Sequence, residues 1–166
     1  MGEGSGGGPH VGYPGARPGP LVGEGSRGSV QGMPWSDIDI SVNGQIDDRE
    51  LNALHAAAFG SDSTEIPWGD RLARRSLFWV TARERGELLG FVNVIGDGGA
   101  HAFLLDTCVR PWRQAEGIGS ALVEAAVVEA RERGCEWLHA DYDQGRAPFY
   151  EKLGMRPTAA GLLRLR

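Results

Sequence analysis

The sequence predicts an α/β (α+β) domain over residues 36–166, built on a mixed and mostly antiparallel central sheet. Two observations predict this class. β-rich runs separated by tight turns fill residues 77–109, which is typical of an antiparallel meander. A long amphipathic helix and then another β-rich run follow, and a strand, a helix and a strand in that order form a right-handed parallel crossover. Antiparallel and parallel pairing should therefore meet in one sheet, with helices on both of its faces.

The first part of the domain contains one strand and two helices. Alternating apolar residues predict a strand at 38–42 with one buried face. Asp47 or Asp48 is then placed to cap a helix that ends at Gly60. Residues 61–76 are expected to form a loop followed by a short helix.

The remainder of the domain supplies the meander and the crossover. Three successive strands are expected at 77–83, 88–95 and 101–109. The amphipathic helix keeps its apolar residues on one face and ends at Gly134. The domain is completed by a strand at 137–142, a short helix at 147–153 and a last edge strand with Leu162, Leu163 and Leu165.

Composition restricts the class of protein. The 166 residues are 41% hydrophobic and 23% charged, which is ordinary for a soluble globular protein and argues against a disordered or membrane protein. The net charge of -5 gives no overall attraction to nucleic acid or to an anionic membrane. Cys108 and Cys135 have no metal-ligand spacing, and the N-terminus carries no apolar signal segment. We therefore expect no metal and a cytoplasmic location.

Residues 1–33 differ from the domain because glycine and proline dominate them, with almost no periodic apolar residue. We expect this segment to be disordered. A flexible arm, an added leader and a mis-assigned translation start before Met33 are the alternatives. The last two are favoured, because the segment carries no charge pattern and no ligand motif.

A glycine-containing loop before the long helix predicts an anion site. In the run VRPWRQAEGIGSALVEAA, Pro111 ends a strand, and Gly117 and Gly119 stand at the first turn of the helix. Glycine lets the backbone approach a ligand, the first N–H groups of a helix have no internal partner, and the helix dipole adds about half a positive charge there. A diphosphate suits such a site. Alternatively, the glycines only permit tight packing of strand and helix, and the loop alone leaves both interpretations open.

Two motifs together resemble one family. The segment QAEGIG after a VRP strand end resembles the Q/RxxGxG/A loop of the GNAT superfamily of acetyl-CoA-dependent N-acetyltransferases, and GRAPFYEKLGM resembles the closing FYxKLGF segment of that family. The resemblance covers about residues 38–166. It implies a GNAT-like mixed sheet of about six to seven strands with helices on both faces. It also implies acetyl-CoA as co-substrate and transfer of an acetyl group to a primary amine of a small molecule or protein.

The resemblance further implies which residues hold the cofactor. The pyrophosphate would be wrapped by the loop and the helix start, largely through backbone N–H groups and with a hydroxyl group from the last residue: Gln114, Ala115, Glu116, Gly117, Ile118, Gly119 and Ser120. The backbone of Cys108 and Val109 would line the pantetheine arm, while the Cys108 side chain is expected to be a small buried thiol. Arg110, Arg113 and Lys152 are either neutralising partners for CoA phosphates or ordinary solvated charges.

The resemblance implies a catalytic acid, whereas the base rests on less specific signals. Tyr150 matches the tyrosine of FYxKLGF, whose hydroxyl group is similar to a general acid near the CoA sulfur. The alternative is a tyrosine that only covers the cofactor. Asp106 stands on the strand before the loop and is placed to take the amine proton directly or through water. Equally, it is a solvent-facing or ion-paired strand residue.

The acceptor and the partners are less well defined. Asp62 and Glu65, with Trp68 beside them, would suit a cationic amine, although a solvated loop with an anchored tryptophan is the plainer interpretation. No nucleic acid and no membrane partner is expected, and an exposed final strand leaves a homodimer open. The alternative function is a catalytically silent acetyl-CoA-binding sensor or interaction module. The intact glycine loop and Tyr150 favour the enzyme.

Overall fold

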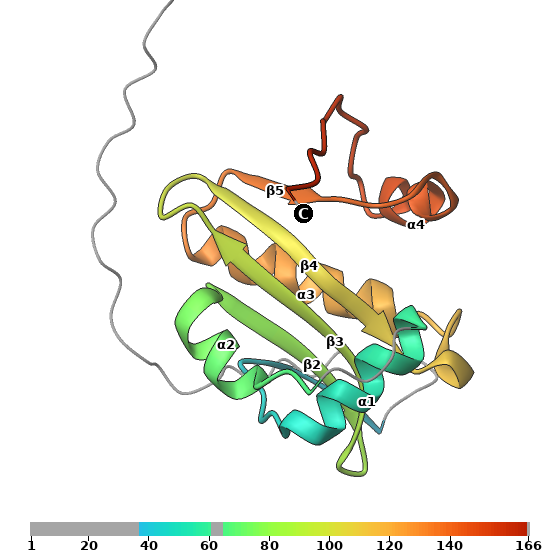
Figure 1. Ribbon diagram of the computed structural model, residues 1–166. Coiled ribbons are helices and arrows are strands. Elements are labelled where there is room, and N and C mark those ends of the chain that lie inside the picture. The colour runs from blue at the N-terminus through green and yellow to red at the C-terminus, as the bar shows by residue number, and fades with distance from the viewer. Residues whose placement is uncertain (1–36, 61–64, 166) are drawn as a thin grey trace, which may run out of the picture.

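Figure 1 shows the computed structural model, in which residues 37–60 and 65–165 are described. Within these ranges the chain forms a sheet of five strands in the order β1-β2-β3-β4-β5. The strands are β1 (Ile38–Val42), β2 (Phe78–Glu84), β3 (Glu87–Gly96), β4 (His101–Val109) and β5 (Trp137–Ala140). Neighbours from β1 to β4 are antiparallel, and β5 is parallel to β4. The predicted mixed, mostly antiparallel sheet is confirmed.

The helices follow the predicted order. They are α1 (Asp48–Phe59), α2 (Trp68–Arg75), α3 (Ile118–Glu132) and α4 (Ala147–Lys152), with short 3₁₀ helices η1 (Pro111–Arg113) and η2 (Gln144–Arg146). Asp47 is the cap of α1, because its carboxylate accepts a hydrogen bond from the N–H group of Glu50 at 2.9 Å. Gly60 ends this helix in a left-handed conformation with a φ of 63°.

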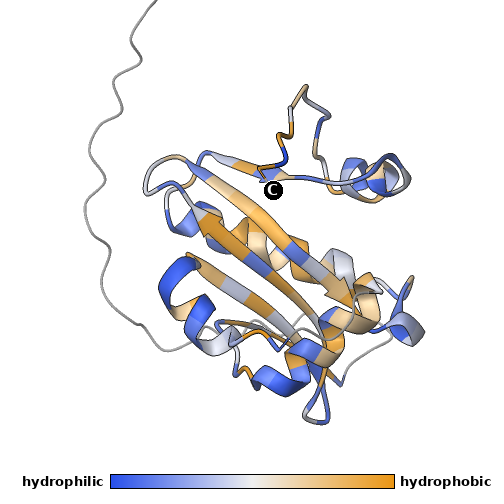
Figure 2. Ribbon diagram, in the orientation of Figure 1, coloured by the Kyte–Doolittle hydropathy of each residue, from blue (hydrophilic) through white to orange (hydrophobic). Residues whose placement is uncertain are grey.

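Helices cover both faces of the sheet (Figure 1). On one face α3 packs against alternating residues of the strands, among them Val80, Val92 and Leu104. On the other face α1 and α2 bury a second cluster that contains Trp68 and Phe91. The central strands carry mostly hydrophobic residues (Figure 2), because both of their faces are covered. The sheet is thus a rigid platform whose loops present the candidate site.

Strands β4 and β5 pair over only part of their length. Their parallel register runs from His101–Trp137 to Leu104–Ala140. Beyond Leu104, β4 remains paired with β3 as far as Val109. Strand β5 and the chain that follows it turn away from β4 there (Figure 1). In this second half, Asp106 and Thr107 lie opposite the single residue Val92 of β3, which makes a β-bulge. One edge of the carboxyl-terminal half of β4 is therefore covered by no described strand.

The predicted number of strands, six to seven, is not confirmed, since the described residues form five. The expected last strand is absent from residues 155–165, where Leu162, Leu163 and Leu165 are 87%, 83% and 86% exposed. A physical reason is that β5 ends at Ala140 and offers an edge of only four residues for pairing. Residues 1–33, for which we expected disorder, lie outside the described part of the chain. Among the described helices none is long and apolar enough to cross a membrane.

Candidate functional site

The predicted anion loop leaves β4, passes through η1 and turns into α3. Ala115 and Gly117 have left-handed backbone conformations, with φ values of 64° and 91°, and these turn the chain into the helix. No side chain caps the start of α3, and its first turn holds no acidic residue. Ala121 donates the first backbone hydrogen bond of the helix, to the Gly117 carbonyl group. The N–H groups of residues 118–120 have no acceptor in the described chain, so they are available to an anion.

The surroundings of Gly119 bear on the two interpretations of the glycine loop. A Cβ atom at this position would lie 3.6 Å from the Phe149 ring and 3.7 Å from Val109, which is ordinary van der Waals contact. The fold therefore does not need glycine here for close packing. A glycine in the first turn of a helix also lowers helix stability relative to alanine. Both facts favour a ligand that approaches this backbone closely.

Arg113 anchors the loop to the β2–β3 hairpin. Its guanidinium group lies 2.8 Å from a Glu84 carboxylate oxygen and 2.8 Å from a Glu116 carboxylate oxygen. These hydrogen bonds raise the pKa of Arg113 and lower the pKa of Glu84. The amide group of Gln114 also donates to the Val109 carbonyl group at 3.2 Å. Arg113 is therefore held by two carboxylates, which leaves the Glu116 charge neutralised beside the anion loop.

The predicted pantetheine-binding residues end β4. Cys108 pairs with Phe91 and Val109 pairs with Gly90, so one edge of each is bound to β3. The Cys108 side chain is 4% exposed and packs on the α1 face of the sheet. Burial raises the pKa of its thiol to about 12, and the nearby Asp106 carboxylate adds to this effect. The predicted small buried thiol is confirmed.

Tyr150 and its neighbour on α4 lie beside the loop. Phe149 is the ring nearest to the backbone of Gly119, and Tyr150 contacts it edge to face at 4.9 Å between ring centroids. Tyr150 also stacks on Tyr142 at 4.5 Å and is only 6% exposed. Its hydroxyl group forms no hydrogen bond with the described part of the chain. The structure thus brings the second motif next to the first.

Asp106 lies on the other side of the sheet from Tyr150. Tyr150 belongs to the cluster under α3, whereas Asp106 contacts α1 and α2 through His55 at 3.3 Å and Arg71 at 3.7 Å. The amide group of Asn93 lies 3.5 Å from the same carboxylate. Asp106 is therefore ion-paired, which was one of the two predicted alternatives, and the two catalytic candidates do not touch.

Sequence patterns did not single out these three partners of Asp106. They come from α1, α2 and β3, and His55 stands 51 residues before Asp106. These residues meet Asp106 only in the folded chain, so the spacing of residues along the sequence does not predict the contacts. The plainer interpretation of Trp68, an anchored tryptophan, is confirmed, because Trp68 is fully buried and donates its indole N–H to Asn52 at 3.1 Å. Asp62 lies outside the described residues.

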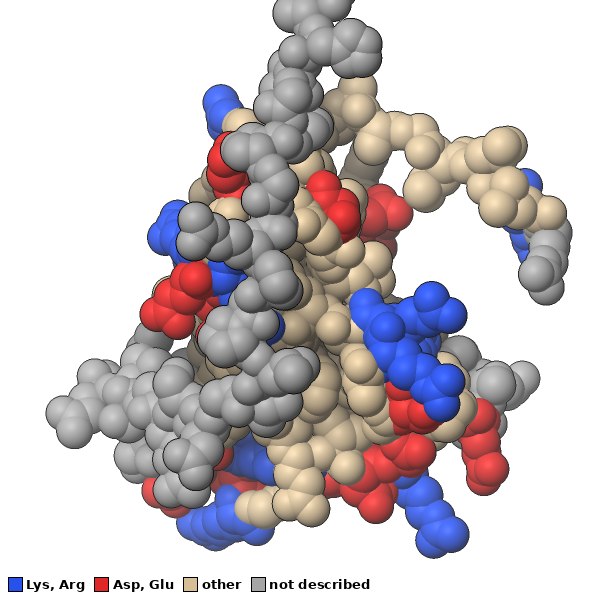
Figure 3. Space-filling view, turned by 90° about the vertical axis from the view of Figure 1, so that its left-hand side faces the viewer, with Lys and Arg blue, Asp and Glu red and all other residues tan. Residues whose placement is uncertain are grey.

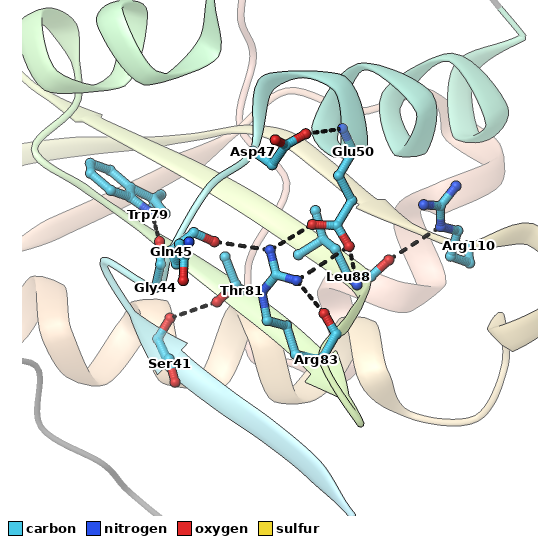
Figure 4. Close-up of polar contacts among 11 residues, drawn as sticks. Ser41, Gly44, Gln45, Asp47, Glu50, Trp79, Thr81, Arg83, Leu88 and Arg110 are labelled. Carbon is cyan, nitrogen blue, oxygen red and sulfur yellow. Dashed lines mark hydrogen bonds and ion pairs between the residues drawn. The ribbon is translucent and has the colours of Figure 1, made fainter.

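A separate cavity of about 620 Å³ lies at the start of α1, beside β1 and β2. Figure 4 shows the Arg83 guanidinium group at this place, 2.8 Å from the Glu50 carboxylate and 3.0 Å from the Gln45 carbonyl oxygen. No predicted site residue lines the cavity.

On the face of the molecule in Figure 3, acidic side chains lie beside basic ones. Within the described ranges no three His, Cys, Asp or Glu side chains are grouped to hold a metal ion.

Known proteins are similar to this chain in sequence and in fold. The acetyltransferase (GNAT) family matches residues 47–155. Mycothiol acetyltransferase of Nocardia farcinica is 34% identical over 122 residues, which are 71% of this chain and 39% of that protein. The chain thus spans about two fifths of the length of this curated relative.

Solved structures agree on the fold. An acetyltransferase from Trypanosoma brucei has a TM-score of 0.67 at 22% identity, over 78% of this chain and 99% of that one. A GNAT family acetyltransferase from Brucella melitensis, solved in complex with acetyl-CoA, has a TM-score of 0.59 at 24% identity, over 71% of this chain and 83% of that one. Because the family match spans more than half of the chain and includes both motifs, the protein belongs to the acetyltransferase (GNAT) family.

Proposed function

We propose that the protein transfers the acetyl group of acetyl-CoA to a primary amine of a small molecule or a protein. The observation that carries this proposal is the uncapped start of α3, which lies where the edge of β4 is free of β5. A phosphate ester at a helix start gains from the N–H groups and from the dipole. The family match and the acetyl-CoA complex of the relative from Brucella melitensis support acetyl-CoA as the ligand.

Binding of the cofactor is assigned to the backbone of the loop. The pyrophosphate would accept hydrogen bonds from residues 117–120, with the Ser120 hydroxyl group in addition. Gln114, Ala115 and Glu116 shape the approach to this site. The pantetheine arm would run along the backbone of Cys108 and Val109, on the edge of β4 that β5 leaves open. When bound, acetyl-CoA supplies the activated thioester.

The two proton transfers are assigned to opposite faces of the sheet. Tyr150 is assigned the acid role, because its hydroxyl group has no partner in the described chain and its ring lies beside the loop residue Gly119 through Phe149. The base side is assigned to Asp106 and the groups that it contacts on α1 and α2. An amine that approaches from that face and a thiolate that leaves on the Tyr150 side would not compete for space.

The acceptor, the cellular location and the assembly complete the proposal. The curated relative is named a mycothiol acetyltransferase, which supports a small-molecule acceptor related to mycothiol as one to test. Two free cysteines support a cytoplasmic location. The exposed leucines of residues 162–165 support a homodimer in which this segment pairs with a second copy, because burying such a side chain is favourable by about 1.5–3 kcal/mol.

The test is a titration followed by turnover. Acetyl-CoA, CoA and ATP are titrated into the purified protein by calorimetry, and free thiol is then followed with a panel of amines. We expect acetyl-CoA and CoA to bind, ATP to bind less well, and thiol release to depend on an amine. Binding with no turnover on any amine would instead favour the silent sensor module. No binding of acetyl-CoA would refute the proposal.

A further inference from the structure

The backbone of β4 is distorted at one residue close to the proposed path of the pantetheine arm. Asp106 has a φ of 54°, inside a strand and in the bulge opposite Val92. A left-handed conformation at a residue other than glycine costs on the order of 1–3 kcal/mol and persists where the surroundings impose it. Here the distortion comes two residues before Cys108. It also places the Asp106 carboxylate against α1 and α2.

Three elements hold this carboxylate in place. Arg71 of α2 and Asn93 of β3 lie 3.7 Å and 3.5 Å from Oδ2. Asn93 is only 2% exposed, and its own amide oxygen accepts a hydrogen bond from the Ser76 hydroxyl group at 2.6 Å. The second oxygen, Oδ1, lies 3.3 Å from Nε2 of His55 on α1. Both carboxylate oxygens of Asp106 are therefore engaged, which leaves this group poorly placed to take a proton itself.

His55 has the features of a proton acceptor. A carboxylate beside Nε2 favours the neutral tautomer in which Nε2 carries the hydrogen atom and Nδ1 is the acceptor. The ring is set by Phe59 at 4.5 Å and Trp68 at 5.4 Å between centroids. The side chain is 21% exposed, so solvent reaches it. The charged group in contact with it is Asp106 from β4, whose other oxygen is ion-paired with Arg71 from α2.

We propose that His55 is the catalytic base of the transfer and that Asp106 is the residue that positions it, an inference that rests on the proposed function. As the neutral amine attacks the thioester, a C–N bond forms and the C–S bond breaks. The amine proton passes to Nδ1 of His55, and the CoA sulfur takes a proton from the Tyr150 hydroxyl group. Solvent then removes the proton from His55 and returns one to Tyr150. Base and acid thus act from opposite faces of the sheet at the end of β4.

The test compares His55→Gln and Asp106→Asn with His101→Gln, a matched control at the amino-terminal end of β4. For His55→Gln we expect kcat to fall about a hundredfold or more, acetyl-CoA affinity by calorimetry to stay within twofold, and the acidic limb of the pH–rate profile, where a base is lost to protonation, to disappear. Asp106→Asn should lower kcat about tenfold. Added imidazole should restore part of the turnover of a His55→Ala variant, which a purely structural role would not allow.

Each outcome decides one point. Retained kcat in His55→Gln would overturn the inference while leaving the proposed function intact. Loss of turnover in Asp106→Asn together with retained turnover in His55→Gln would show that the carboxylate accepts the amine proton. That result would also overturn the inference. Absence of turnover in the unmodified protein would refute the proposed function itself. Melting temperatures within a few degrees of the unmodified protein confirm that each variant is folded.

Discussion

Replacement of Gly119 by aspartate should affect stability and cofactor binding in opposite directions. The new Cβ atom would lie 3.6 Å from Phe149 and 3.7 Å from Val109, so the free protein has room for it. The position is in the first turn of α3, where an acidic side chain stabilises a helix by about 0.3–1 kcal/mol. We therefore expect the variant to melt at the same temperature or a few degrees higher.

The expected loss of affinity follows from Coulomb's law. Two unit charges about 5 Å apart repel by about 0.8 kcal/mol at the dielectric constant of water. A pyrophosphate with two negative charges would therefore be disfavoured by about 1.7 kcal/mol, which raises the Kd about fifteenfold. A partly desolvated site screens less, so fifteenfold is the lower bound. A second effect adds to this, because the carboxylate competes for the same N–H groups.

Calorimetric titration with acetyl-CoA measures this change, and Gly119→Asn is the matched control because it has nearly the same shape and no charge. The asparagine variant should bind more tightly than the aspartate variant, and the difference should shrink at high salt. An unchanged Kd for Gly119→Asp would refute the placement of the pyrophosphate at the start of α3.

Four further predictions concern Tyr150, Arg113 and Cys108. Tyr150→Phe should lower kcat about a hundredfold with little change in acetyl-CoA affinity, whereas equal kinetics would limit Tyr150 to packing. Arg113→Ala should weaken acetyl-CoA binding because the Glu116 carboxylate loses its partner; Glu116→Gln in the same chain should restore the affinity, and a failure to do so would contradict this explanation. Because burial raises the pKa of Cys108 from 9.0 to about 12, its thiol should resist iodoacetamide at pH 8, which mass spectrometry would show. The same shift should make the free energy of unfolding decline as pH rises from about 9 to about 12, in chemical denaturation at each pH.

Local signals were sufficient for most elements of the fold. Asp47 and Gly60 mark the two ends of α1 because a cap and a left-handed glycine act within one turn of the helix. The tight turns of the meander likewise depend on a few adjacent residues. The prediction of a last strand was wrong because a strand there, with Leu162 in it, needs the free edge of a neighbouring strand for its hydrogen bonds. Strand β5 has only four residues to offer.

The candidate site was predictable in part. The loop at Gly117 and the tyrosine at 150 lie in contiguous motifs, and the fold brings α4 beside the loop. The surroundings of Asp106 were not predictable. His55 is 51 residues away in the sequence, and no local sequence pattern indicates the bulge in which Asp106 lies. The burial of Trp68 was equally a property of packing between α1, α2 and β3. Contacts of this kind depend on the whole fold.

The central claim is that the start of α3 binds the pyrophosphate of acetyl-CoA. Amide NMR spectra of the ¹⁵N-labelled protein, recorded during a titration with acetyl-CoA, test it most directly. We expect the N–H signals of residues 117–120 to shift and to saturate at the Kd found by calorimetry, while signals around the separate cavity at Arg83 stay in place. Heat of binding without any shift at residues 117–120 would contradict it.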